Sequence, residues 1–229
     1  MRPLLFTLVF LIVHQPLMAE VNKHFAKPNY EQIKKLTTNK ALATWYPKLL
    51  TRYNNHDTTL SNADFHLLYY GFFFQPEYKK VGMPLAVKDS IKAIYKKQNF
   101  TNKATKDERI QLIGLTQTLL KTEPFNVNSL NRLYILYLEL GKKDSSNLYK
   151  YKLEKVAQTL FASGDGRTDS TGIHVLAIDD EYSILSLLGY EYEGSHTHTK
   201  SHADLLKVRK NDDNIDGMYF DVKQILKVK

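Results

Sequence analysis

The stretch from residue 104 to residue 161 has the sequence ATKDERIQLIGLTQTLLKTEPFNVNSLNRLYILYLELGKKDSSNLYKYKLEKVAQTLF, and it predicts three consecutive helices. Thr105, followed three places later by Glu108, forms a capping box, which marks the start of the first helix. Leucines then recur at helical spacing, so each helix has an apolar face. Pro124 and Gly141 mark the two connections. Because these connections are short, we expect the helices to pack as antiparallel hairpins.

Further helices are predicted before this stretch, and strands after it. The helices lie at residues 30–36, 41–53, 60–74 and 85–97, and Asp144 or Ser145 is expected to cap the third helix of the stretch above. Beyond Gly164 we predict a buried strand at 173–178, a short helix at 181–188, a strand at 190–193, and a hairpin of 205–209 with 217–222. The fold class is therefore α+β, with TPR-like antiparallel helical hairpins followed by a small C-terminal β-sheet with one helix.

The first 19 residues have the pattern of a secretory signal peptide. Arg2 gives a basic start, residues 4–13 are apolar except for Thr7, and Ala19 is a small residue after which a signal peptidase can cut. Ten apolar residues are too few for a bilayer span, which takes about 20. We therefore expect an exported protein, periplasmic or associated with the cell envelope, cleaved after Ala19 and without a transmembrane segment in the mature chain. A short uncleaved anchor is the alternative.

The composition is that of a globular protein, because 43% of the 229 residues are hydrophobic and 24% are charged. The chain contains no cysteine, which excludes disulfides, thiolate nucleophiles and cysteine-ligated zinc. A chain without thiols also suits an oxidising compartment. We divide the sequence into a signal peptide at 1–19, a helical-hairpin region at 20–163, and a small α/β region at 164–229 packed on it.

The formal charge of +8 is unevenly distributed along the chain. Residues 20–163 carry a net charge of +11, from 23 basic and 12 acidic residues, and residues 164–229 carry −4, from 8 basic and 12 acidic residues. Export and the scattered positions of the lysines argue against nucleic acid as a partner. An anionic lipid, a polysaccharide or an acidic protein would be attracted to the positive region.

Aromatic residues are concentrated in the predicted helix at 60–74 and just after it. Tyr69, Phe72, Phe73 and Tyr78 are the candidates for a ligand groove. Packing in the core is the favoured interpretation of this aromatic set, with the tyrosine hydroxyls hydrogen-bonded at its edge.

Two segments of the C-terminal region resemble metal sites. His196, His198 and His202 are the best metal candidate, although their polar surroundings favour a solvated loop. Residues 212–217 match the start of a calcium-binding EF-hand loop, but Lys223 occupies the position that requires a glutamate. A hairpin loop is therefore favoured there. No metal and no cofactor is expected.

No familiar catalytic motif occurs in the sequence, neither a nucleophile elbow, nor a zinc-protease helix, nor a glycine-rich nucleotide fingerprint. The sequence therefore favours a non-enzymatic module that binds a partner, an envelope protein or a glycan. The alternative is an envelope hydrolase acting on glycan or peptide. For this alternative, carboxylates such as those of Asp57, Asp64, Asp165 and Asp169 are expected to lie about 5 to 10 Å apart.

Two family resemblances follow from local strings. Five residues fall at positions of a single degenerate tetratricopeptide repeat: Pro124, Leu130, Leu133, Tyr137 and Gly141. This resemblance implies helical hairpins and not a binding groove. Seven further segments span nearly the whole mature chain: PNYEQIK (28–34), WYPKL (45–49), DTTL (57–60), YYGF with QPEY (69–78), GDG (164–166), DEYSIL (180–185) and YFD (219–221).

These seven segments resemble the domain-of-unknown-function family 4919, whose members are exported bacterial proteins without an assigned activity. The resemblance implies an envelope location. It transfers no catalytic or binding residue, and the three histidines lie outside the pattern.

Overall fold

A computed structural model describes residues 25–82, 84–101 and 104–227. The helices before the sheet are α1 (Tyr30–Thr38), α2 (Tyr46–Asn54), α3 (Asn62–Gly71), α4 (Leu85–Thr101), α5 (Lys106–Leu120), α6 (Val127–Glu139) and α7 (Lys143–Ser163). Two 3₁₀ helices, η1 (Phe72–Phe74) and η2 (Pro76–Lys80), lie between α3 and α4. The predicted signal peptide, residues 1–19, lies outside the described residues.

The C-terminal part contains a small sheet with helices beside it. It comprises η3 (Asp169–Thr171), β1 (Ile173–His174), α8 (Ile178–Leu187), β2 (Tyr192–His198), β3 (Ala203–Val208), β4 (Gly217–Asp221) and α9 (Lys223–Leu226). The strand order is β1-β4-β3-β2, with β1 parallel to β4 and the other neighbours antiparallel. The predicted α+β class and the hairpin of β3 with β4 are thereby confirmed.

Local signals account for the ends of the central helices. In the capping box of α5, the Glu108 amide donates to Thr105 Oγ1 at 3.2 Å and the Thr105 amide donates to Glu108 Oε2 at 2.9 Å, as predicted. Gly141, with φ of +70°, lies in the short connection between α6 and α7, which pack on each other as a hairpin. The predicted cap of α7 is wrong: Lys142 is the N-cap residue, without a capping side chain, and Asp144 lies in the first turn.

Three predicted boundaries differ from the structure. The helix predicted from residue 41 begins at Tyr46, because residues 39–45 form turns and Pro47 favours the first helical turn. The strand predicted at 173–178 is only Ile173–His174, and Ile178 already begins α8. The strand predicted at 190–193 is β2, which starts at Tyr192 and continues to His198.

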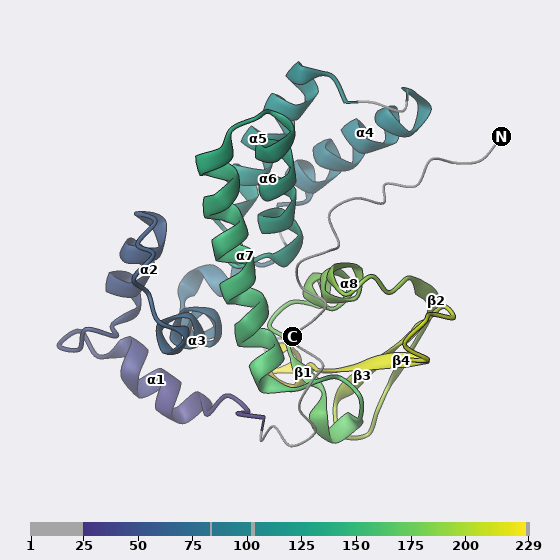
Figure 1. The fold of residues 1–229 in the computed structure, drawn as a ribbon. Helices are drawn as coiled ribbons and strands as arrows, with labels where there is room; N and C mark the ends of the chain where they lie inside the picture. The colour runs from purple at the N-terminus through teal and green to yellow at the C-terminus, as the bar shows by residue number, and fades with distance from the viewer. Residues whose placement is uncertain (1–24, 83, 102–103, 228–229) are drawn as a thin grey trace.

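The helices and the sheet share one main core. Figure 1 shows α7 passing between the group α1 to α3 and the sheet, and α7 packs against both α3 and β1. Tyr70 Oη donates to the His174 carbonyl at 3.2 Å, and Tyr78 Oη donates to the Leu176 carbonyl at 2.8 Å. The buried cluster runs from Ile33 in α1 to Ile225 in α9. A smaller apolar cluster lies among α4, α5 and α6.

No helix in the described part of the chain combines the length and the apolar character that crossing a membrane requires.

Candidate functional site

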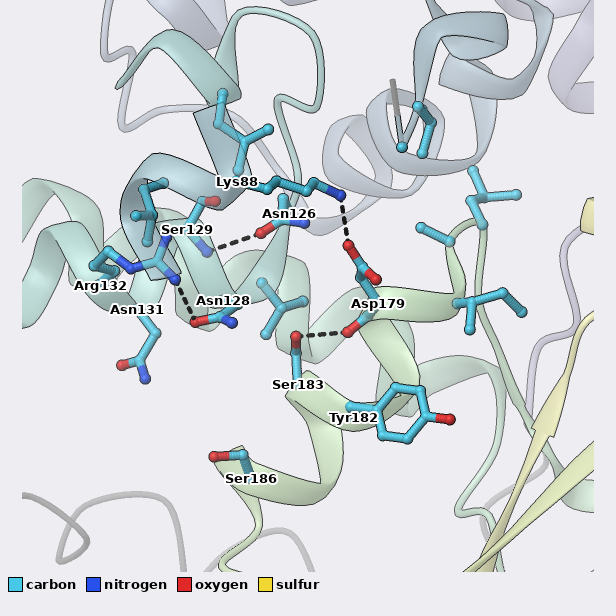
Figure 2. A pocket seen from close by; sticks show the side chains of 18 of the residues that line it. Lys88, Asn126, Asn128, Ser129, Asn131, Arg132, Asp179, Tyr182, Ser183 and Ser186 are labelled. Carbon is cyan, nitrogen blue, oxygen red and sulfur yellow. Dashed lines mark hydrogen bonds and ion pairs between the residues drawn. The ribbon is translucent and has the colours of Figure 1, made fainter. Parts of the chain in front are cut away.

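A cleft of about 1050 Å³ opens between α4, α6 and α8 (Figure 2). Three large apolar side chains with high exposure lie along it, namely Leu85 and Tyr95 of α4 and Tyr182 of α8. Exposed apolar side chains that line the same cleft indicate a binding site.

Lys88 of α4, which lines the cleft, lies between two carboxylates. Its Nζ is 2.6 Å from Asp179 Oδ2 at the start of α8 and 3.3 Å from Glu123 Oε1, which is buried in the loop before α6. Burial alone would lower the pKa of Lys88, but the hydrogen bond that Lys88 donates to Asp179 and the charge of Glu123 raise it above its ordinary value. Lys88 therefore stays charged and forms ion pairs with both carboxylates.

One backbone amide and one side-chain amide also hold Glu123 in place. The Gly82 amide donates to Oε1 at 2.9 Å, and Asn126 Nδ2 donates to Oε2 at 3.0 Å. Both oxygens of this carboxylate thus have partners before any ligand arrives.

Asp180 lies beneath the cleft, with 4% of its surface exposed. It accepts a hydrogen bond from Tyr69 Oη at 2.9 Å, and the Val127 amide at the start of α6 lies 3.5 Å from its other oxygen. Burial raises its pKa to about 7, and these hydrogen bonds oppose that rise only in part. Asp180 and Glu123 both line a small cavity of about 30 Å³, large enough for one water molecule.

Four basic side chains line the cleft without an ion-pair partner among the described residues: Lys79, Lys92, Lys96 and Arg132. Lys88 and Asp179 also line the cleft, so the lining holds five basic residues and one acidic residue, a net charge of +4. The net charge is +3 when Glu123, the second partner of Lys88, is counted as well. The cleft is therefore an electropositive site.

The first turns of α6 contribute neutral polar groups. Asn126 caps the helix by accepting from the Ser129 amide at 2.8 Å (Figure 2). Asn128 and Asn131 follow on the same helix and also line the cleft. Ser129 is fully buried, and within the described part of the chain its Oγ has no hydrogen-bond partner.

The aromatic residues singled out from the sequence lie mostly below this cleft. Tyr69, Phe72 and Tyr78 are buried and line the small cavity, and Tyr78 also reaches the main cleft. Phe73 is half-buried and packs against the rings of Tyr78 and Tyr30 instead.

The three histidines lie on the far edge of the sheet, outside the cleft. His196 and His198 are exposed on β2, and His198 Nδ1 is 2.6 Å from Asp204 Oδ1 on β3. His202 follows in the turn, its ring 5.8 Å from that of His198. Within the described ranges, no group of three or more metal-binding side chains is placed to hold an ion.

Each of the four carboxylates considered for hydrolysis has a partner elsewhere in the chain, and none lines the cleft. Asp57 pairs with Arg52 at 2.7 Å, and Asp64 accepts from the Ser61 amide in the capping box of α3. Asp165 accepts from the Arg167 amide, and Asp169 contacts Ser201.

Sequence reasoning missed Lys88, Lys92 and Arg132 as members of one site. Lys88 and Lys92 lie on α4 and Arg132 lies on α6, and a local pattern does not reveal that these two helices meet at one site. The acids at 179–181 lie in the first turn of α8, where negative charge complements the positive end of the helix dipole.

Comparison with known proteins places the chain in a family. The family described as "Domain of unknown function (DUF4919)" matches residues 31–229, and the chain belongs to it. Neither the curated proteins nor the solved structures include a match.

Proposed function

We propose that this member of the DUF4919 family is an exported protein of the bacterial envelope that binds a partner in the cleft between α4, α6 and α8, without catalysing a reaction. The proposal rests on one observation, namely that exposed apolar side chains and basic side chains lie together in that cleft. These side chains line a cleft of about 1050 Å³, and the basic ones other than Lys88 have no ion-pair partner among the described residues. The carboxylates of Glu123 and Asp179 are already paired with Lys88.

The alternative function, an envelope hydrolase, needs two carboxyl groups of which one is free to accept a proton. In the cleft, Asp179 and Glu123 both contact Lys88, and Asp180 is buried beneath the lining. This arrangement favours binding, and the hydrolase stays the second prediction.

The proposed location rests on the sequence of residues 1–19 and on the absence of cysteine. N-terminal sequencing of the protein from fractionated cells tests it. The expected product begins at Glu20 and is found in the envelope fraction. A cytosolic product that begins at Met1 would contradict the location.

Filling the cleft tests the binding proposal. Ser186 lines the cleft from an exposed position on α8, so Ser186→Trp places a large side chain there without disturbing the core. The matched control is Gln158→Trp, at an exposed position of α7 outside the cleft. Both variants and the wild-type protein are used as bait in envelope extract, and captured proteins and sugars are quantified by mass spectrometry.

The wild-type protein and Gln158→Trp should capture a common component that Ser186→Trp does not. If Ser186→Trp captures the same components in the same amounts, the cleft is not the binding site.

A further inference from the structure

We infer that the ligand of the cleft is an anionic oligosaccharide and that Arg132 is its principal anchor. This inference rests on the proposed function and names the ligand class for the same site. Three observations carry it, namely the charge of the cleft, the way Arg132 is held, and the kinds of neutral groups around it.

The charge requires an anion of some length. Lys92 and Lys96 are four residues apart on α4, so they lie on one face of the helix, and both are exposed. Neither has an acidic partner in the described part of the chain, and both line the cleft. A row of cations beside a groove favours a ligand with repeated negative charges over a single small ion.

Arg132 is oriented before a ligand binds. Its Cζ lies 5.6 Å from the centroid of the Tyr95 ring, and its Nη2 donates to Asn128 Oδ1 at 3.4 Å (Figure 2). The contact with Tyr95 joins α6 to α4 across the cleft, and the contact with Asn128 lies within α6. Among the described residues, the other guanidinium N–H groups have no hydrogen-bond partner. A guanidinium held in one plane binds a carboxylate or sulfate through two parallel hydrogen bonds.

The neutral groups favour sugar over peptide. Asn131 and Ser186 line the cleft together with Ser183, and Ser129 has an unpaired hydroxyl beneath it. Amides and hydroxyls both donate and accept hydrogen bonds, which is what sugar hydroxyl groups require. Tyr182, at the other end from Arg132 in Figure 2, offers an exposed ring against which the apolar face of a sugar can pack.

The cleft offers an extended peptide fewer suitable contacts than it offers a sugar. The walls are the helices α4, α6 and α8, so no strand edge is offered for backbone pairing. The mixed polar lining also differs from the continuous apolar groove that receives an amphipathic helix.

The test is calorimetric titration of the mature protein with four probes of equal length: a hexagalacturonate, a sulfated hexasaccharide, neutral maltohexaose, and a hexaglutamate peptide. We expect at least one anionic sugar to bind and the neutral sugar not to bind, and which anionic sugar binds tighter identifies the acidic group. Arg132→Gln should weaken the anionic sugar on the order of tenfold, through loss of charged hydrogen bonds.

Lys92→Gln is a second variant, at an exposed position where folding is not at risk, and it should also weaken binding. Lys210→Gln, in the hairpin loop away from the cleft, is the control and should bind as the wild-type protein does. Failure of both anionic sugars, equal binding of hexaglutamate, or unchanged affinity in Arg132→Gln and Lys92→Gln would overturn the inference. If Ser186→Trp still loses its captured component in that case, the ligand class is wrong and the binding function stands.

Discussion

The buried carboxyl group of Asp180 makes the stability of the protein depend on pH. Its pKa is raised to about 7 from an ordinary value of 3.8, mainly by burial. Between these values the folded protein keeps a proton that the unfolded chain releases, so the free energy of unfolding falls as the pH rises from 4 to 7. The contribution that is lost amounts to about 4 kcal/mol.

Asp180→Asn removes this titration and keeps the size of the side chain. We expect the free energy of unfolding in urea to fall between pH 5 and pH 8 in the wild-type protein and to change much less in the variant. Equal losses in both proteins would show that Asp180 does not bind the proton.

Lys152 is a buried cation that has no carboxylate partner among the described residues, and it gives the opposite pH dependence. Its Nζ lies 4.1 Å from the centroid of the Tyr53 ring, and burial lowers its pKa to about 8 from an ordinary 10.5. The folded protein loses this proton first, so stability rises with pH between 8 and 10.5. At pH 7, Lys152→Met is expected to raise the free energy of unfolding by about 2 kcal/mol, because it removes a desolvated charge.

The partly exposed Lys150 on the same helix provides the control, and Lys150→Met should change stability by no more than about 0.5 kcal/mol. A loss of stability in Lys152→Met would mean that the contact with Tyr53 outweighs the cost of burial.

At the scale of elements, the end of α7 depends on a glycine. A Cβ atom at Gly164 would lie 2.3 Å from the Thr171 carbonyl oxygen and 2.6 Å from that of Gly172, and backbone atoms yield little. Gly164→Ala should therefore destabilise the protein by at least about 2 kcal/mol. At Gly114, inside α5, a Cβ meets nothing within 4 Å, and Gly114→Ala should stabilise the protein by about 0.5 to 1 kcal/mol. Thermal unfolding of both variants measures the difference, and similar midpoints would contradict it.

Elements with explicit local signals were predictable from the sequence. The capping box at Thr105 and the turn at Gly141 are read from single residues whose chemistry fixes the backbone. The extent of the strand in the run 173–178 could not be predicted, because a short apolar segment is compatible with a buried strand and with the buried start of a helix. After His174, the Val175 amide donates to the Asp221 carbonyl and the Leu176 amide donates to Tyr69 Oη, so the strand can end there. Both partners are distant in sequence, so a local pattern does not reveal them.

At the scale of the whole molecule, the shared core predicts that the two regions fold together. Tyr70 and Tyr78 donate hydrogen bonds to the segment at 174–176, and α7 packs against β1. A fragment that ends at Ser163 would expose these tyrosines and the apolar residues around them. We expect residues 20–163 alone to give no cooperative unfolding transition, whereas the full mature chain gives one, as followed by circular dichroism. A cooperative transition in the fragment would show that the division at residue 163 separates independent domains.

The cleft itself could not have been predicted from the sequence. Lys88, Arg132 and Asp179 belong to three helices, and each by itself has the pattern of an ordinary charged helix face. Only the packing of α6 against α8 and the placement of α4 beside them create the site. The net positive charge of residues 20–163 was visible beforehand, and it is the one property of the site that composition reveals.

Photo-crosslinking from position 186 in intact cells tests most directly whether the cleft holds a ligand. A photoreactive residue at Ser186 should give a specific adduct, and the same residue at Gln158 should give none. Absence of an adduct at position 186, or equal adducts from both positions, would contradict binding in the cleft between α4, α6 and α8.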